Sequence, residues 1–564
     1  MKFLKPTFFA LTLLLATSPA QAFAPPAQKD MVAASSPYAT QAGLEILRQG
    51  GSAVDAAIAT QLVLTLVEPE SSGIGGGAFM LLYDKATHRI TSFDGRETAP
   101  ASATPTMFLD ANGNPRPHFD AVPGGLSVGV PGIVAMLELA HKKYGKLPWA
   151  KLFAPAIHLS ENGFKVSDKL AKSIAKYPQM AQMPDFRAYL YHKTGKPLAE
   201  GEVLKNPAYA KTLRILAKGG AKAFYSGAIA QNIIDKVNNA PVNRAKMTLA
   251  DLSAYRALER APVCGVYRTY KLCSMGPPSS GGIAVLQILG MLERFNEKEL
   301  TPNSLSEVHL SSEASRLAFA DRAKYLGDPS VVTVPIAGLL DRNYLRSRSK
   351  LIDPARDMGE AKAGTPPMKR ADYAPQRTPQ LPGTSHFSIV DQYGQVVSMT
   401  TTIEFAFGAQ MMANGFFLNN ELTDFSFEAT RDGKPVANAP APGKRPMSAM
   451  SPTIVFKPDG SFWIATGSPG GPVIIPYVAQ SLIALIDGKQ TPQQAASQPH
   501  HANLNGPTIL EENTPITALA PALEKMGHTI RIAPMQSGLH IIEKTKYGYI
   551  GGADIRRDGN VRGD

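Results

Sequence analysis

Cysteine is scarce: the chain of 564 residues contains two, Cys264 and Cys273. Two cysteines, with no histidines at a matching spacing, do not make up the usual zinc-ligand sets, so we expect no metal site and no other cofactor. The cysteines flank residues 268–269 symmetrically, and a two-residue hairpin there would place them opposite each other. A disulfide would then form in an oxidising compartment, and two buried free thiols fit the sequence equally well.

Blocks of basic residues are also missing. The formal net charge is +12, but the lysines and arginines are scattered, and no cluster of them alternates with aromatic residues. We therefore expect no nucleic-acid partner and attribute the positive charge to anionic small-molecule substrates or to solubility. Hydrophobic residues make up 44% and charged residues 18% of the chain, which is typical of a globular protein with a large core.

Long apolar runs are absent after residue 22, so we expect no membrane-spanning helix. Residues 1–22 combine a basic start at Lys2 and Lys5, an apolar run over 8–16 and the cleavage pattern Ala-Gln-Ala at their end. This arrangement predicts a secretory signal peptide and hence a periplasmic or secreted protein. An uncleaved anchor is the alternative.

Strands near both ends of the chain, with mainly helical stretches over 130–345, predict a mixed α/β fold. A strand at 31–36 is followed by two helices, the first at 39–48 and the second opened by a capping box at 52–55. The glycines at 75–77 precede a strand and do not open a helix, which does not fit a dinucleotide-binding loop.

The strand patterns of 384–391 and 395–403 predict a β-hairpin. The three-residue loop between them ends in Gly394, which suits the left-handed position of a bulge. Counting outward from the loop puts Thr384 opposite Thr402. Directly opposed residues have Cβ atoms about 4.5–5.5 Å apart, so the two hydroxyls are expected to lie close together. Strand propensity by itself would also explain both threonines.

The segment 353–382 is rich in proline, lysine and glycine, and we expect it to be exposed and flexible. A flexible segment directly before Thr384 suits a chain that is cut between Gly383 and Thr384. The cut would give Thr384 a free α-amine, which titrates near pH ~7.7–8.0 and can take the proton of the threonine's own hydroxyl. His386 lies on the same strand face, but the amine already supplies a base, so we interpret His386 as structural.

Two further stretches have the composition of binding elements. Arg96 follows a predicted strand at 90–93 and could clamp a carboxylate through two hydrogen bonds, although a surface ion pair would explain it too. Gly470 and Gly471 follow a predicted strand at 462–466 and precede an apolar helix, so their amides could stabilise developing negative charge. A plain glycine turn is the alternative.

From about residue 31 to 563 the chain resembles the γ-glutamyltransferases (γ-glutamyl transpeptidases). The resemblance rests on six short stretches in matching order and spacing: 50–57, 277–282, 383–386, 418–421, 450–453 and 467–471. It implies a four-layer α-β-β-α sandwich of the N-terminal nucleophile hydrolase type. It also implies self-cleavage into a large subunit, 23–383, and a small subunit, 384–564, which stay associated in one integrated domain.

Catalytic roles follow from the resemblance. Thr384 is similar to the nucleophile and Thr402 to its hydroxyl partner, while Gly470 and Gly471 are similar to the oxyanion hole. The implied reaction forms a γ-glutamyl ester on Thr384 from glutathione-like amides. Water or an amine acceptor, such as an amino acid or peptide, then takes the acyl group.

Binding roles follow in the same way. Arg96 and Ser448 match residues that hold the α-carboxylate of the glutamyl group, and Glu421 and Asp424 match residues that hold its α-amine.

Three departures from the family pattern concern this pocket. Glu404 stands where many relatives carry asparagine and adds a third carboxylate, and crowded carboxylates raise one another's pKa. Ala449 replaces the second member of a serine pair and removes a hydroxyl. The stretch 425–447 has no tyrosine and is short for a lid. The alternative function is therefore an acylase of glutaryl-type side chains of cephalosporins that acts mainly as a hydrolase. An uncleaved, inactive binding homologue is a third interpretation.

Overall fold

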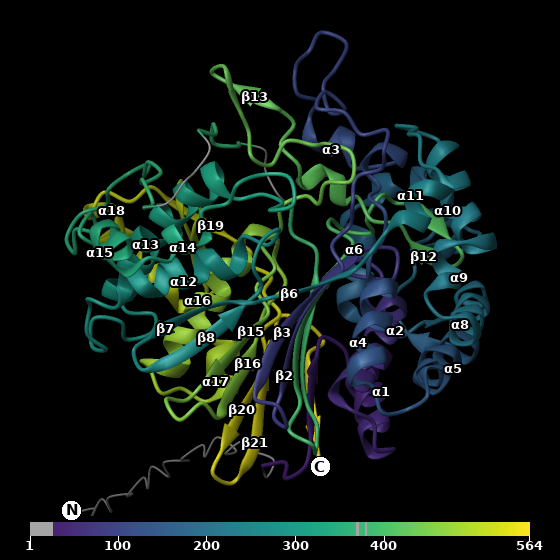
Figure 1. Ribbon diagram of the computed structural model, residues 1–564, viewed down its shortest axis with the longest axis horizontal. Helices are drawn as coiled ribbons and strands as arrows, with labels where there is room; N and C mark the ends of the chain where they lie inside the picture. The colour runs from purple at the N-terminus through teal and green to yellow at the C-terminus, as the bar shows by residue number, and fades with distance from the viewer. Residues whose placement is uncertain (1–25, 368–371, 378–380) are drawn as a thin grey trace, which may run out of the picture.

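Two large antiparallel sheets lie face to face at the centre of the protein, and helices cover the outer face of each (Figure 1). The computed structural model describes residues 26–367, 372–377 and 381–564, so the predicted signal peptide at 1–22 lies outside the described residues. The layers follow one another as helix, sheet, sheet, helix, which confirms the expected four-layer fold.

The first sheet has seven strands. In spatial order they are β22 (Asn560–Gly563), β1 (Met31–Ala34), β9 (Ser385–Val390), β10 (Val396–Thr402), β2 (Gly77–Asp84), β3 (Arg89–Asp94) and β6 (Leu258–Arg260). Because side chains alternate along a strand, Met80 and Leu82 of β2 join the core shared with the helices, whereas Phe79 and Leu81 join the core shared with the second sheet. Burial on both faces explains the continuous apolar run of this strand.

The second sheet has six strands. In spatial order they are β21 (Gly548–Ala553), β20 (His540–Thr545), β16 (Phe462–Thr466), β15 (Thr453–Phe456), β8 (Tyr270–Ser274) and β7 (Val263–Tyr267). Strand β20 packs on β1 and β9, and β16 packs on β9 and β10, so the middle strands of the two sheets face each other.

Helices from the first half of the chain cover the first sheet. They are α1 (Pro37–Arg48), α2 (Ala53–Val67), α4 (Ile133–Tyr144), α5 (Ala154–Asn162), α6 (Asp168–Lys176), α7 (Pro184–Leu190), α8 (Pro207–Gly219), α9 (Lys222–Tyr225), α10 (Gly227–Asn238) and α11 (Leu249–Ala254). Helix α2 lies directly on β9 and β10, and its predicted capping box between Ser52 and Asp55 is confirmed.

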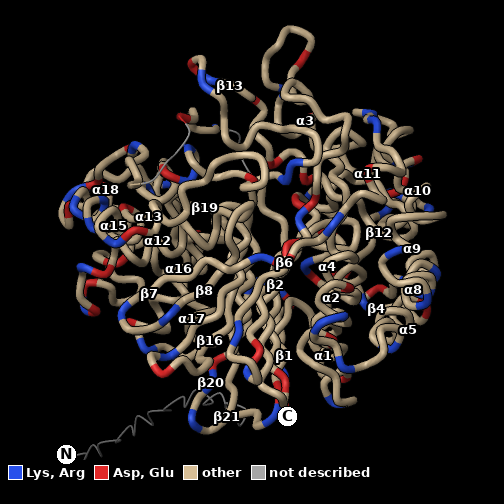
Figure 2. Tube along the Cα trace, in the orientation of Figure 1, with Lys and Arg blue, Asp and Glu red and all other residues tan. Residues whose placement is uncertain are grey.

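Helices from both halves of the chain cover the second sheet. They are α12 (Gly281–Leu292), α13 (Leu305–Tyr325), α14 (Ile336–Leu339), α15 (Arg342–Ser349), α16 (Ile474–Ile486), α17 (Pro492–Ser497) and α18 (Ala520–Lys525). None of the described helices is long and apolar enough to cross a bilayer. Figure 2 shows that basic and acidic residues lie interspersed over the helices of both sides.

Shorter elements connect these layers. One is the short helix α3 (His118–Ala121). Four small sheets pair β4 (Phe164–Lys165) with β5 (Val203–Leu204), β11 (Met412–Ala413) with β12 (Phe416–Phe417), β13 (Thr430–Arg431) with β14 (Lys434–Pro435), and β17 (His501–Asn503) with β18 (Thr508–Glu511) and β19 (Ile530–Ala533). The 3₁₀ helices are η1 (Gly125–Ser127), η2 (Trp149–Phe153), η3 (Pro178–Gln182), η4 (Glu421–Asp424), η5 (Gly471–Val473) and η6 (Pro515–Leu519).

The predicted hairpin at 384–403 is confirmed together with its register. Strands β9 and β10 pair Ser385 with Thr401, so Thr384 and Thr402 are the next positions along the ladder. Gly394 has φ +83°, the left-handed conformation expected at the bulge. The alternation and turn chemistry of this stretch therefore place the two threonines correctly.

The two cysteines lie in a second confirmed hairpin. Strands β7 and β8 place Cys264 opposite Cys273, and a disulfide joins them. Arg268 in the turn has φ +54°, as a two-residue hairpin requires. Of the two alternatives left open by the sequence, the structure contains the disulfide.

The prediction for 353–382 is partly wrong. The described part of this segment forms no helix or strand. Tyr373, Ala374 and Gln376 are nevertheless buried, and Ala374 pairs with Val436 in an isolated parallel bridge. The composition of this segment suggested that it is exposed to solvent, but the chain around Val436 packs against it. Residues 368–371 and 378–380 lie outside the described residues.

Candidate active site

The candidate site lies at one end of the space between the two sheets. Along β9, His386 and Ser388 face the second sheet, and Ser388 Oγ donates to the His540 carbonyl on β20 at 2.9 Å. Thr384 has the same parity and faces the same space. All predicted site residues except Gly470 line one narrow pocket there. The lining consists of Arg96, Leu381, Gly383, Thr384, Thr402, Glu404, Glu421, Asp424, Ser448, Ala449, Met450, Gly471 and Ile474.

Two threonine hydroxyls converge on the carbonyl oxygen of Gly383. The Thr384 hydroxyl donates to it at short range, and Thr402 Oγ1 donates to the same oxygen at 2.8 Å. The backbone N–H of Glu404 donates to Thr402 Oγ1 at 2.7 Å. Because this bond uses an acceptor site of the Thr402 hydroxyl, the hydroxyl hydrogen is left for Gly383. The Thr384 hydroxyl oxygen thus lies beside a peptide carbonyl that accepts two hydrogen bonds.

The backbone around the peptide bond between residues 383 and 384 is unusually close. A Cβ atom on Gly383 would lie 2.0 Å from the Glu404 carbonyl oxygen, and one on Gly471 would lie 2.4 Å from the Leu381 carbonyl oxygen. Gly470 and Gly471 have φ +138° and +60°. Glycine is therefore needed at these positions, and residues 381–383 lie across the predicted oxyanion hole.

Arg96 is buried two residues after the end of β3, and its guanidinium donates four hydrogen bonds. Its Nη2 donates to Asp424 Oδ2 at 2.5 Å and to the Met447 carbonyl at 3.0 Å, and its Nε donates to the Pro446 carbonyl at 3.1 Å. Nη1 donates to Glu421. The sequence assigned Arg96 and the two acids to opposite ends of a bound glutamyl group, and the structure pairs them directly. A ligand carboxylate can therefore bind the Arg96 guanidinium only where it displaces Glu421 or Asp424.

Carboxyl groups outnumber cations in this pocket, and Glu97 lies beside it, 3.9 Å from Arg96. Burial raises the pKa of Glu97 to about 8, and it raises the pKa of Glu404 and of Glu421 well above the ordinary range. Burial by itself lowers the pKa of Arg96, but Glu421 and Asp424 together raise it. A further cation in the pocket would favour the ionised form of these carboxyl groups, so the surplus of acids favours its binding. Glu97 was missed from the sequence, where its only signal is its place next to Arg96.

Ser448 and Ala449 lie on a loop that a second motif supports. The Ser448 N–H donates to the Pro278 carbonyl at 3.0 Å, and Ser280 Oγ donates to the Ser448 carbonyl at 2.5 Å. A Cβ on Gly281 would lie 2.1 Å from Ser451 Oγ. The stretch 277–282 therefore holds the binding loop in place, which explains its presence among the matching motifs.

A buried polar network behind Thr384 was not predicted. Ser385 Oγ donates to Glu68 at 2.6 Å, and Lys169 Nζ donates to the other oxygen of Glu68 at 2.6 Å. Arg557 Nη1 donates to the Thr384 carbonyl at 2.9 Å. These bonds fix the backbone of Thr384 from behind. No sequence pattern links such distant positions.

His386 uses both ring nitrogens away from the reacting carbonyl. Nδ1 lies 2.9 Å from Thr400 Oγ1, and Nε2 lies 3.3 Å from Ser388 Oγ. Burial, together with the neighbouring His540, holds the pKa of His386 well below its ordinary value. A structural role therefore remains our interpretation.

Comparison with known proteins agrees with this geometry. The family model described as Gamma-glutamyltranspeptidase matches residues 39–563. Glutathione hydrolase proenzyme of Bacillus subtilis strain 168 is 38% identical over 517 residues, covering 90% of this chain and 86% of the relative. Acylase ACY 1 proenzyme of Pseudomonas sp. strain SE83 is 35% identical over 542 residues, covering 94% and 93%.

A solved structure shows the same fold. The crystal structure of cephalosporin acylase from Bacillus halodurans superposes with a TM-score of 0.84 at 28% identity and covers 99% of each chain. The family match extends over nearly the whole chain and includes every predicted site residue. The protein is therefore an enzyme that belongs to the gamma-glutamyltranspeptidase family.

Proposed function

We propose that the protein cuts its own chain between Gly383 and Thr384 and then hydrolyses or transfers γ-glutamyl groups from amides such as glutathione. The observation that carries the proposal is the convergence of the Thr384 and Thr402 hydroxyls on the Gly383 carbonyl oxygen. The proenzyme names of the Bacillus and Pseudomonas relatives support processing.

Processing begins when Thr384 Oγ1 attacks the carbonyl carbon of Gly383, with Thr402 donating to the oxygen that becomes negative. The peptide C–N bond breaks, the hydroxyl proton moves to the leaving nitrogen, and an ester joins Gly383 to Thr384. Water then hydrolyses the ester. The products are a Gly383 carboxylate and a free Thr384 that carries both an α-amine and a hydroxyl.

Catalysis reuses the same oxygen. The free amine of Thr384 takes the hydroxyl proton while Oγ1 attacks the γ-carbonyl of the substrate. Amides of Gly470 and Gly471 stabilise the oxyanion once residues 381–383 have moved away. The amine product leaves with the proton, and water or an acceptor amine resolves the γ-glutamyl ester.

The charge of the pocket distinguishes the two candidate substrates. A γ-glutamyl group brings both a carboxylate for Arg96 and an ammonium for Glu404, Glu421 and Asp424. A glutaryl group brings the carboxylate alone and offers these acids no ammonium to pair with. The acid surplus therefore favours γ-glutamyl amides, whereas the overall likeness to cephalosporin acylase favours the second candidate.

Paired anilide substrates test this choice. We expect kcat/KM for γ-glutamyl-p-nitroanilide to exceed that for glutaryl-p-nitroanilide by about 10²-fold, equivalent to about 2.7 kcal/mol. A preference for the glutaryl compound would establish the acylase alternative. A single full-length band on a denaturing gel, with neither activity, would establish the uncleaved binding homologue.

Thr402→Val should slow processing by about 10²–10³-fold, because it removes one of the two hydroxyls on the Gly383 carbonyl. The time course of the two bands after synthesis measures this rate. Thr401→Val is the matched control, since Thr401 is the neighbouring buried threonine and its hydroxyl has no partner among the described residues. Equal rates in both variants would contradict the role of Thr402.

Glu97 should make stability depend on pH. The pKa of Glu97 in the folded protein is about 8, against an ordinary value of 4.5. Its contribution to the free energy of unfolding is therefore complete below pH 4.5 and is lost as the pH rises to about 8. In that window, each such group lowers the free energy of unfolding by about 1.4 kcal/mol for each pH unit of increase. Thermal melts at pH 5, 6.5 and 8 should show a smaller decline for Glu97→Gln than for the exposed control Glu45→Gln. Parallel profiles would contradict the assignment.

We also propose export to the periplasm or the medium, with removal of residues 1–22. The N-terminal sequence pattern and the disulfide between Cys264 and Cys273 support this location. N-terminal sequencing of both fragments should find one that begins at Phe23 and one that begins at Thr384.

A further inference from the structure

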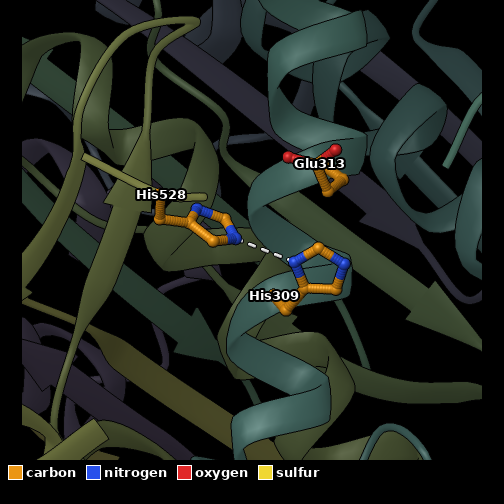
Figure 3. Close-up of side chains that lie close together, drawn as sticks. All are labelled: His309, Glu313 and His528. Carbon is orange, nitrogen blue, oxygen red and sulfur yellow. Dashed lines mark hydrogen bonds between the residues drawn. The ribbon is translucent and has the colours of Figure 1, made fainter. Parts of the chain in front are cut away.

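Two buried histidines and a glutamate lie together and do not line the candidate active-site pocket. His309 and Glu313 are one turn apart on α13, and His528 faces them from the loop between α18 and β19 (Figure 3). One ligand atom of each residue lies within 4.8 Å of the others, and His309 Nδ1 is 2.8 Å from His528 Nε2. Imidazole nitrogens with one carboxylate oxygen form a donor set that suits zinc.

We propose that His309, Glu313 and His528 bind one Zn²⁺ ion that links α13 to the C-terminal part of the chain. Zinc binds such atoms at about 2.0–2.2 Å, which places ligand atoms about 3.3 Å apart in a tetrahedral site. The two imidazole nitrogens are already close to this separation. A rotation of the Glu313 side chain brings the carboxylate into range, and water completes the four ligands.

In each ring, one nitrogen contacts an oxygen atom outside the cluster, and the other nitrogen points toward the position proposed for zinc. His309 Nε2 donates to the Asp353 carbonyl at 2.7 Å, which fixes the tautomer whose Nδ1 carries the lone pair. On the other ring, His528 Nδ1 lies 2.9 Å from Thr508 Oγ1 and 3.6 Å from Asp357 Oδ1. Oxygen partners of this kind orient metal-binding imidazoles in zinc sites.

The charges around the cluster leave room for a cation. Glu313 and Asp357 face a single guanidinium, Arg316, which lies 3.0 Å from Glu313 Oε1 and 2.7 Å from Asp357 Oδ1. The other oxygen of Glu313 accepts the Met358 N–H at 2.9 Å. Since each carboxylate oxygen has two lone pairs, an oxygen of Glu313 can accept a hydrogen bond and ligate zinc at the same time. Without zinc, the two rings share one N–H···N hydrogen bond.

The ion would join the two fragments of the processed enzyme. His309 and Glu313 precede residue 383, and His528 follows it, so the ligands come from both sides of the proposed cut. This consequence rests on the proposed function, whereas zinc binding itself does not.

Zinc stoichiometry tests the proposal. We expect equilibrium dialysis of the purified protein against Zn²⁺, followed by elemental analysis, to find one tightly held equivalent. His528→Gln should lose it, and Glu313→Gln should weaken it by at least about tenfold. The matched control is His501→Gln, because His501 is another buried histidine that contacts α13, through Glu307 at 3.2 Å, and lies outside the cluster. His501→Gln should keep the equivalent.

Two further measurements keep the test decisive. Zinc at 100 times its Kd should raise the melting temperature of the wild type and of His501→Gln by about 2 °C, with no shift in His528→Gln. If His528→Gln does not fold, anomalous scattering from a zinc-soaked wild-type crystal should show the ion between His309 and His528. No tight equivalent, equal binding by His528→Gln, or anomalous signal only elsewhere would overturn the proposal. Each outcome is separate from processing and from anilide turnover.

Discussion

Thr384→Ala should leave the protein as a single full-length band on a denaturing gel and reduce γ-glutamyl-anilide turnover by at least about 10⁴-fold. The variant lacks the oxygen that attacks the Gly383 carbonyl, so neither the cut nor the later acyl ester can form. The loss of this one oxygen atom accounts for both the missing cut and the lost turnover. A gel and a turnover assay on the same preparation measure them together.

Two neighbouring variants separate chemistry from folding. Thr384→Ser keeps a hydroxyl on the same backbone and should still process and turn over, within about 10²-fold of the wild type. Ser385→Ala keeps Thr384 and removes the two bonds of the Ser385 hydroxyl, one to Glu68 and one from Ser72, so it should also yield two bands. Two bands from Thr384→Ala would contradict the self-cleavage proposal outright.

Arg96→Lys should reduce kcat/KM for the γ-glutamyl anilide by about 10²–10³-fold, mainly through KM. Lysine keeps the positive charge but cannot present two parallel N–H donors to a carboxylate. Arg96 now donates to Glu421, Asp424 and two backbone carbonyls, and an ammonium has three protons for these four acceptors. Binding of the substrate carboxylate should therefore suffer more than the chemical step does.

An arginine from the same region provides the control for this variant. Arg260 on β6 pairs with Asp94 of β3 at 2.7 Å and does not line the pocket. Arg260→Lys should change kcat/KM by less than about threefold. An unchanged KM in Arg96→Lys, or an equal loss in both variants, would show that Arg96 does not hold the substrate.

The hairpin of β9 and β10 was predictable because its rules are local. Side-chain alternation, turn length and the glycine at 394 fix the register of two strands that follow each other in the chain. The same logic correctly paired Cys264 with Cys273. In each case the sequence separation is short, and no other part of the chain is needed to decide the pairing.

The rest of the pocket could be named only through the resemblance to a family. Arg96 and Glu421 are 325 positions apart, and their contact depends on the order of strands in the first sheet and on the place of η4. Burial of Tyr373 was missed for the same reason, since its cover comes from a distant loop. Composition describes a segment but does not identify what packs on it.

By itself, the sequence determined the two hairpins, the strand that Thr384 directly precedes and the family. Only the tertiary structure decided that Arg96 pairs with the acids, that Glu97 joins them, and that His309 meets His528 across 219 positions. Local patterns reflect backbone sterics and periodicity over a few residues. Contacts between distant segments depend on how whole sheets and helices pack, and this packing also sets the burial that shifts the pKa of each acid.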